Sequence, residues 1–406
     1  MDEISRYAVG LDIGTGNVRA VAASIAGNGT LNVIGYGEAP NSGMRRGTVV
    51  NLAGPAEAIN KALAAVEPMS GYEVNSAVIS INGTQITSTR VDGMIAVRGE
   101  SVTEEDLARV EDVALSGQDL ANQMILSVVP LQYTIGGQSG VRNPLGMTGT
   151  KLQMKANVVS TLMPTYTNLI KVVEGMKVPL TAEQVVPSVE AAAKAVLSER
   201  QRENGVAVID IGASTTGVAV YEENDLQYIG VVPVGSNNIT NDLAVMLAID
   251  TEVAEEIKRR FASANFGATD SPVVIRWRGK ELRFAREQID EVVEARMDEI
   301  MDLVRKEIKK AHYDQRLPEG AVLTGGGARM RDIDKFVRGK LEMSVKIGAP
   351  SGLSGVADTI QKPEYATAVG LMLVSAEGGH VMAKVAKKGK KKEGGGNIFS
   401  KIFSKF

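Results

Sequence analysis

The sequence predicts an α/β protein in which two similar α/β subdomains face each other across a shared cleft. Three stretches support this prediction: residues 8–22, 206–221 and 321–330. The first two read as an apolar strand that ends in Asp, a turn of glycine and small hydroxylated residues, and a second apolar strand. The third reads as an apolar strand that runs into three glycines. Because the acidic turn occurs twice, two related subdomains explain the pattern better than two unrelated hairpins do.

The turn within residues 206–221 has the composition of a phosphate site. Asp210 ends its first strand, and the turn follows with Gly212, Ser214, Thr215 and Thr216. The strand delivers one carboxylate, while the turn offers backbone N–H groups and hydroxyls, which together suit a phosphate with its metal ion. The pattern is weak by itself, because Asp-Gly turns also close ordinary hairpins.

An earlier turn repeats this arrangement near the start of the chain. Asp12 corresponds to Asp210 and Gly14 to Gly212, and a third strand is predicted over residues 31–37. We expect both acidic turns to face the shared cleft.

The glycine run follows a strand predicted over residues 321–323. It consists of Gly325, Gly326 and Gly327, and a helix is predicted from Ala328. Glycines let the backbone approach a planar or phosphorylated ligand where Cβ atoms would clash. Such a turn is common in α/β folds, so it is only moderately specific.

Composition narrows the function classes. At 406 residues the chain is expected to form several domains, and it has no cysteine, which excludes disulfides, thiolate zinc sites and cysteine nucleophiles. The two histidines, His312 and His380, are far apart and indicate neither a metal cluster nor a catalytic triad. We expect no signal segment in the acidic N-terminal stretch and no membrane-spanning run.

Periodicity and capping residues predict the remaining elements. Residues 272–287 form a basic strand segment. Further helices are predicted over residues 56–66, 105–113, 185–197 and 286–312, and strands over residues 77–81, 124–133 and 152–162.

The order of acidic hairpin, acidic hairpin and glycine-rich strand-to-helix turn resembles the actin-like ATPase superfamily. The resemblance extends to about residue 377 and implies an α/β fold of two RNase H-like subdomain pairs around a nucleotide cleft, with ATP and Mg²⁺ as cofactors. Residues 83–89 and Pro144, Gly146 and Met147 resemble the inserted small α+β subdomain of the bacterial cell-division family FtsA.

The resemblance implies a division of the chain into subdomains that alternate along the sequence. The first pair comprises subdomain 1A (residues 1–82, 164–204 and 349–380) and the inserted subdomain 1C (residues 83–163). The second pair comprises subdomain 2A (residues 205–235 and 318–348) and subdomain 2B (residues 236–317). A flexible basic linker (residues 381–396) and a C-terminal amphipathic helix (residues 397–406) complete the chain.

The resemblance also implies roles for the motif residues. Asp12 and Asp210 would hold Mg²⁺ indirectly, through water. The phosphates would be cradled by Gly14, Thr15, Gly16, Asn17, Gly212, Ser214, Thr215 and Thr216. The nucleoside would be lined by Gly235, Glu255, Lys258, Gly325, Gly326 and Gly327. A helix over residues 251–261, which the resemblance also implies, would place Glu255 and Lys258 one turn apart on a shared face, either at a ligand or as a solvated ion pair.

Three positions depart from the family pattern. Asn17 stands where the family usually carries Lys, and Ala213 and Ser214 stand where the second turn usually carries glycine. A missing cation stabilises the hydrolytic transition state less, and Arg19 is an uncertain substitute. Glu190 is a weak candidate for positioning water and is otherwise a surface residue. We therefore expect ATP binding with, at most, slow hydrolysis.

The helix predicted over residues 286–312 resembles the FtsA helix beside which the tail peptide of the tubulin-like protein FtsZ docks. Arg296 occupies the family's arginine position, and Arg286 opens the same helix. An acidic and hydrophobic peptide needs cations beside an apolar groove, so both arginines are candidate partner contacts. The alternative is an ordinary helix surface.

The C-terminal segment is basic and ends in an amphipathic pattern. From Lys384 onward the chain carries eight lysines and one glutamate, a charge of +7. Because the full chain has a net charge of −3, the residues before Lys384 carry a charge of −10. On a helical wheel the apolar residues of the last ten gather on one side, which suits a helix lying in an anionic membrane interface. The alternative is docking on this chain or on a helical partner. The membrane residues would be Ile398, Phe399, Lys401, Ile402, Phe403, Lys405 and Phe406.

The resemblance implies a polymerising, peripheral membrane protein of the cell cycle that anchors FtsZ filaments at the septum. Its partners would be the FtsZ tail, itself as a filament, anionic membrane lipids and, through the inserted subdomain, later division proteins, with no nucleic acid. Its location would be the cytoplasmic face of the cell membrane at the division site. The rival interpretations are a PilM-type pilus-assembly adaptor and a small-molecule kinase of the same superfamily.

Overall fold

Two sheets with the same strand order organise the chain. The computed structural model describes residues 6–117, 121–176, 179–311 and 317–378. In the first sheet β1 (Arg6–Ile13), β2 (Asn17–Ile25) and β3 (Leu31–Pro40) form an antiparallel meander. The strands β6 (Ser76–Ile81) and β11 (Thr181–Pro187) extend it in parallel on the other side of β1. A short β19 (Ser354–Gly355) pairs with β3.

The second sheet repeats this plan. Here β12 (Val206–Ile211), β13 (Thr216–Glu222) and β14 (Asp225–Val232) form the meander. The strands β17 (Ala321–Thr324) and β18 (Val345–Ile347) extend it in parallel beside β12. Since each sheet has an antiparallel hairpin flanked by parallel strands in the same order, the predicted relation between the two halves is confirmed.

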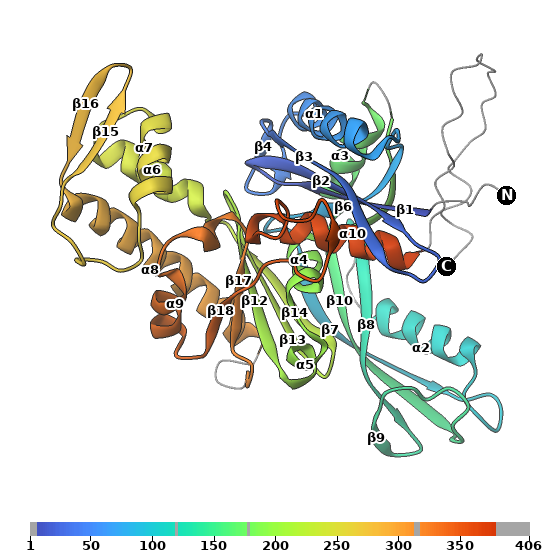
Figure 1. The fold of residues 1–406 in the computed structure, drawn as a ribbon. Helices are drawn as coiled ribbons and strands as arrows, with labels where there is room; N and C mark the ends of the chain where they lie inside the picture. The colour runs from blue at the N-terminus through green and yellow to red at the C-terminus, as the bar shows by residue number, and fades with distance from the viewer. Residues whose placement is uncertain (1–5, 118–120, 177–178, 312–316, 379–406) are drawn as a thin grey trace, which may run out of the picture.

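Helices cover both faces of the first sheet and link it to the second. On one face α1 (Ala53–Ser70) packs against β2 and β3. On the other, α10 (Ala366–Gly378) packs against β1 and β6 and against α4 (Ser188–Val196), which also contacts β12 and β13. A methyl group on Gly10 would lie 2.2 Å from the Ala368 carbonyl oxygen, so α10 lies directly on β1. Figure 1 shows α4 and α10 between the two sheets.

A separate four-stranded sheet lies between β6 and α3 (Met163–Glu174) in the chain, and we call residues 83–162 the insert. Its strand order is β7-β10-β8-β9, and α2 (Glu104–Ser116) packs on β7 and β10. Thr103 and Asp106 form a capping box at the start of α2. The strands are β7 (Thr87–Ala96), β8 (Gln123–Ile135), β9 (Gln138–Val141) and β10 (Lys151–Leu162).

The second half carries a helical unit beyond its sheet. It contains α6 (Ser236–Met246), α7 (Thr251–Phe261) and the long α8 (Arg286–Lys310), with the hairpin of β15 (Val273–Trp277) and β16 (Lys280–Phe284). Figure 1 shows this hairpin at one end of the molecule and β9 of the insert at another. The smaller elements are β4 (Met44–Arg45), β5 (Thr48–Val49), α5 (Glu199–Asn204), η1 (Gly326–Arg329), α9 (Ile333–Leu341) and η2 (Pro363–Tyr365).

Three predicted elements need correction. Residues 185–187 belong to β11, because they pair with β6 and Pro187 disfavours the helical conformation of the residue before it, so the helix begins at Ser188. The glycine run continues into a short 3₁₀ turn, and the α-helix α9 begins only at Ile333. The helix α8 ends at Lys310, and His312 lies outside the described residues.

The described residues bear on the prediction that no segment spans the membrane, but they do not include the predicted amphipathic helix. Among the described helices, none combines the length and the apolar character that crossing a bilayer requires. The predicted linker and amphipathic helix, from residue 381 onward, lie outside the described residues.

Candidate functional site

The two acidic turns face each other directly. A methyl group on Gly16, in the β1–β2 turn, would lie 2.9 Å from the Cβ of Ala213, in the β12–β13 turn. The structure therefore brings together the two hairpins that the sequence predicted to share a site. We call these the first turn (residues 14–16) and the second turn (residues 212–215).

The first turn is closed by its own backbone and supported from the loop after β3. The Gly14 amide donates to the Asn17 carbonyl at 3.1 Å, and Asn41 Nδ2 donates to the Gly14 carbonyl at 2.7 Å. The Gly47 amide donates to Thr15 Oγ1 at 3.0 Å. Asn41 and Gly47 were not predicted for the site, because they lie beyond β3 and only the fold brings them to the turn.

The second turn is fastened to the N-terminus of α6. Gly212 N–H donates to the Thr215 carbonyl, and the amides of Ser236 and Asn237 donate to the carbonyls of Gly212 and Ala213 at 2.9 and 2.7 Å. A methyl group on Gly235 would lie 2.7 Å from the Gly212 carbonyl oxygen, so this position requires glycine. Gly235 thus serves the approach of α6 to the turn.

The three hydroxyls of the second turn differ in what they bind. Thr216 Oγ1 donates to the Val234 carbonyl at 2.8 Å, so it is used within the fold. Thr215 Oγ1 accepts from Asn82 Nδ2 at 3.1 Å. Ser214 Oγ is buried and has no hydrogen-bond partner within the described chain. A buried hydroxyl without a partner is costly, so Ser214 is suited to an anionic ligand oxygen.

Asp12 is buried at the end of β1. Its Oδ1 accepts from Ser80 Oγ at 2.9 Å, and Ser80 Oγ in turn accepts from the Ile13 amide at 2.8 Å. Burial raises the pKa of Asp12, while Arg19 and the Ser80 hydrogen bond oppose the rise. Ser80 was not predicted, although a polar residue among the apolar residues of β6 was a visible signal.

Asp210 is the second carboxylate of the site. Burial raises its pKa to about 7, and repulsion from Asp12 adds to the rise. Thr367 Oγ1, at the start of α10, donates to its Oδ2 at 3.4 Å. Two carboxylates that repel each other, one buried and one half-buried, are suited to a shared cation, which would relieve the repulsion. No group of three His, Cys, Asp or Glu side chains that could hold a metal occurs among the described residues.

The glycine run lies beside Asp210. A methyl group on Gly325, which has φ +80°, would lie 2.1 Å from Asp210 Oδ1, and one on Gly327 would lie 2.3 Å from Ile211 Cγ2. A methyl group on Gly326 would meet no atom within 4 Å. Gly325 and Gly327 therefore serve close packing, whereas Gly326 presents its backbone to open space where a ligand could lie.

Glu255 and Lys258 form a network with α6. Lys258 Nζ lies 2.6 Å from Glu255 Oε2 and donates to Thr240 Oγ1 at 2.8 Å and to the Ser236 carbonyl at 3.2 Å. Burial lowers the pKa of Lys258, and Glu255 opposes this. Since Ser236 is fastened to the second turn, the pair supports the helix that holds the turn.

Glu190 lies on α4 and is half-buried. Burial raises its pKa to about 7 against the opposing charge of Lys194, and its Oε2 is buried without a hydrogen-bond partner in the described chain. Its carboxylate adds to the raised pKa of buried Tyr221, which sits at the end of β13 remote from the turn. Glu190 is half-buried with one enclosed carboxylate oxygen, so it is not the plain surface residue that was expected.

The two candidate partner arginines have different environments. Arg286 is buried, and its Nε donates to Asp290 Oδ1 at 3.0 Å within α8. Arg296 is partly exposed; its Nε and Nη2 donate to Asp242 on α6 at 2.6 and 3.0 Å, and it also pairs with Glu299. The burial of Arg286 does not fit a partner contact, while Arg296 stays at the surface.

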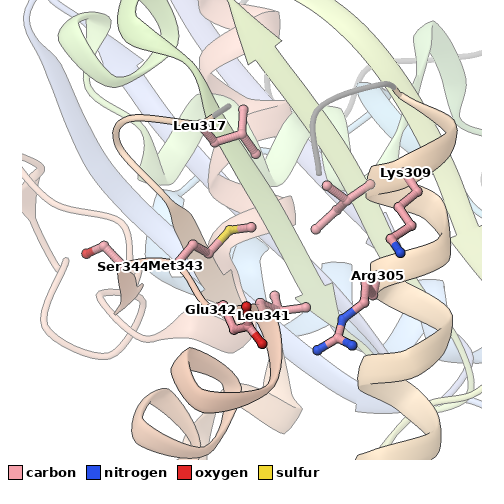
Figure 2. A pocket seen from close by; sticks show the side chains of 8 residues that line it. Arg305, Lys309, Leu317, Leu341, Glu342, Met343 and Ser344 are labelled. Atoms are coloured by element: carbon pink, nitrogen blue, oxygen red, sulfur yellow. The ribbon is translucent and has the colours of Figure 1, made fainter. Parts of the chain in front are cut away.

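A cavity of about 600 Å³ lies elsewhere, between the C-terminal part of α8 and the segment after α9 (Figure 2). Arg305 and Lys309 extend from α8 toward it, and Leu341 and Met343 line the opposite side. None of the predicted nucleotide residues is among its described lining. The predicted membrane residues of the C-terminal helix lie outside the described residues.

Family models and known proteins both match this chain to FtsA over most of its length. Residues 207–370 match the family model "Cell division protein FtsA", and residues 83–160 match "SHS2 domain inserted in FTSA". The chain is 35% identical over 371 residues to the cell division protein FtsA of Pseudomonas aeruginosa, covering 90% of this chain and 88% of that protein. It is 33% identical over 380 residues to FtsA of Escherichia coli K12, covering 90% of each.

Solved structures share the fold at low sequence identity. The PilM–PilN type IV pilus biogenesis complex matches with a TM-score of 0.66 at 16% identity, over 91% of this chain and 98% of that one. MreB 5 of Spiroplasma citri bound to AMPPNP matches with a TM-score of 0.52 at 15% identity, over 91% and 95%. These likenesses show an actin-like fold.

Proposed function

The chain belongs to the FtsA family of cell-division proteins, and from that premise we propose that it binds ATP, polymerises and ties FtsZ filaments to the membrane. The observation that carries the nucleotide part is the meeting of the two acidic turns, with Asp12 buried and Asp210 half-buried behind them. A site with two mutually repelling carboxylates and an unpaired hydroxyl is suited to a phosphate with a divalent cation.

The phosphate groups would bind between the first and second turns. Backbone amides of both turns and the Ser214 hydroxyl would donate to phosphate oxygens, since Ser214 has no partner in the described chain. Asp12 and Asp210 would hold Mg²⁺ through water, and the ion would supply charge neutralisation at the phosphates. Gly326 would face the nucleoside, because its Cα borders open space.

We expect slow hydrolysis because the described residues of the site include no cation at position 17. Asn17, at the start of β2, carries no charge where the family usually has a cation. The charge that acts on the Glu190 carboxyl comes from Lys194, and its own charge acts on Tyr221, so among the described residues this weak candidate for positioning a water interacts with those two side chains and with neither turn. We infer that nucleotide binding serves mainly to hold the two halves together.

The FtsZ tail peptide would dock beside α8 at Arg296. Arg296 is fixed by Asp242, so its guanidinium has a defined direction at the surface. An acidic peptide would approach a cation whose local partners are carboxylates, which makes recognition depend on the balance of these charges.

Membrane attachment would come from residues 397–406, whose apolar side includes Phe399, Phe403 and Phe406. A helix of ten residues is about 15 Å long, half a bilayer core, so it would lie in the interface. One such helix binds weakly, whereas many on one filament bind firmly. The chain would then act on the cytoplasmic face of the membrane at the division site.

Co-sedimentation with anionic phospholipid vesicles in the presence of ATP tests this proposal. The full chain should sediment with the vesicles and recruit FtsZ, while a chain ending at Gly396 should do neither but should still bind ATP. Equal sedimentation of both chains would contradict the anchoring role. A pull-down with the FtsZ tail peptide separates the proposal from the pilus-adaptor interpretation.

A further inference from the structure

One hydrogen bond crosses between the two halves at the second turn. Asn82 directly follows β6 of the first sheet, and its Nδ2 donates to Thr215 Oγ1 at 3.1 Å. Thr215 is 3% exposed and closes the second turn through its carbonyl. The first half thus supplies a side chain to the phosphate turn of the second.

The direction of this hydrogen bond determines what the Thr215 hydroxyl can do. The Asn82 amide is fixed because its Oδ1 accepts from the Gly83 amide at 2.7 Å, which leaves the NH₂ group facing Thr215. A hydroxyl that accepts from an amide keeps its single proton for another acceptor. Asn82 therefore orients Thr215 to donate to a phosphate oxygen.

The position of Asn82 is set by the root of the insert. Asn82 and Gly83 pack against Gly47, on which a methyl group would lie 2.7 Å from the Gly83 nitrogen. Gly83, with φ +121°, begins the insert. A rotation of the insert about this root would therefore move Asn82 relative to Thr215.

The insert contacts α3 and β11 of the first half, and it also contacts β14 in the same half as Thr215. Asn157, on β10 and 1% exposed, donates to the Leu226 carbonyl on β14 at 3.0 Å and accepts from Ser88. At the rim, Arg90 donates to Gln227 at 2.9 Å and Arg142 pairs with Glu223 at 3.1 Å. Figure 1 shows β7 and β10 beside β14.

We propose that Asn82 is a positioning residue of the phosphate site and that it makes nucleotide affinity depend on the docking of the insert against β14. When the insert lies on β14, its root holds Asn82 against Thr215 and the hydroxyl faces the phosphate. When the insert moves away, the hydroxyl loses its orientation. This inference rests on the proposed nucleotide site and adds a route by which partners of the insert change nucleotide binding.

The test is the affinity of the full-length chain for a fluorescent ATP analogue with Mg²⁺. Asn82→Ala should weaken binding by about two- to tenfold, the range of one net hydrogen bond. Asn82→Asp keeps the acceptor for Gly83 but can only accept from Thr215, so it should weaken binding at least as much. The double variant Arg90→Ala/Arg142→Ala, which changes only the rim of the insert contact, should weaken binding about two- to threefold.

The coupling is tested by combining these changes. When Asn82→Ala is combined with Arg90→Ala/Arg142→Ala, nucleotide affinity should fall no further than in Asn82→Ala alone. The reason is that the rim acts on affinity through the Asn82–Thr215 hydrogen bond, which Asn82→Ala has already removed. Arg98→Ala is the matched control, since Arg98 is exposed and pairs with Glu105 inside the insert. Unchanged thermal unfolding of each variant without nucleotide would exclude a folding defect.

The proposal would be overturned if the losses of nucleotide affinity caused by Asn82→Ala and by Arg90→Ala/Arg142→Ala were additive. It would also be overturned if Arg90→Ala/Arg142→Ala bound nucleotide as tightly as the unaltered chain. Those outcomes leave the nucleotide site itself intact. Failure of the unaltered chain to bind the analogue would instead refute the proposed function.

Discussion

Gly16 of the first turn and Ala213 of the second are in contact, with only 2.9 Å between the Cβ of Ala213 and the place where a Cβ of Gly16 would lie. The two halves of the molecule therefore meet at the residues proposed to enclose the phosphates. Residue 16 is glycine, so the only side chain in this contact is the methyl group of Ala213.

Gly16→Val should prevent the two turns from closing. The added side chain would overlap the Ala213 methyl group, so we expect at least a tenfold loss in ATP affinity, or about 1.4 kcal/mol. Isothermal titration with Mg-ATP measures this loss. Gly27→Ala, in the next turn of the same meander, is the control, since a methyl group there would meet nothing within 4 Å. Normal affinity of Gly16→Val would contradict the proposed closure.

Ser214→Ala and Thr216→Ala should separate binding from stability. Ser214 has no partner in the described chain, so its loss should weaken nucleotide binding by about two- to tenfold and leave the free energy of unfolding unchanged or higher. Thr216 donates to Val234, so its loss should cost about 1–2 kcal/mol of stability. Chemical unfolding and nucleotide titration of both variants measure the two effects, and a reversed pattern would refute the assignment.

Arg296→Ala and Asp242→Asn should act in opposite directions on the FtsZ tail peptide. Removing the guanidinium should weaken binding about tenfold or more, whereas removing the carboxylate charge that competes with the peptide should strengthen it severalfold. Fluorescence anisotropy with labelled peptide measures both, with Lys306→Ala on the same helix as the control. Weaker binding by both variants would show instead that the ion pair only supports α8.

The hairpins could be predicted because their signals are local, whereas the helix at residues 251–261 is predicted by its similarity to a helix of the family. An apolar run that ends in Asp and glycine identifies a strand and its turn, and the predicted bounds of α7 coincide with those observed. Asn82 could not be assigned, since its partner Thr215 is 133 residues away and only the packing of the two sheets brings them together.

Burial was the property that the sequence predicted least well. Arg286 opens a helix with a basic segment before it, which favours a surface position, yet Asp290 one turn later allows it to be buried as an ion pair. Glu190 lies in an alanine-rich helix that contacts both sheets, and this packing leaves it half-buried. The spacing of Arg286 and Asp290 is a local pattern, but the packing that buries the pair is not.

Glu190 should make the stability of the protein depend on pH. Its pKa is about 7 in the folded chain and lower, near 4.5, when unfolded, so the folded state binds the extra proton. Its contribution is therefore present below pH 4.5 and is lost as the pH rises toward 7. Glu190→Gln removes this loss and should be more stable than the unaltered chain at pH 8, by about 2 kcal/mol, with little difference near pH 5. Urea unfolding of both proteins at the two pH values measures the difference. Equal gains at both pH values would mean that the glutamine improves packing and that the carboxyl does not titrate in this range.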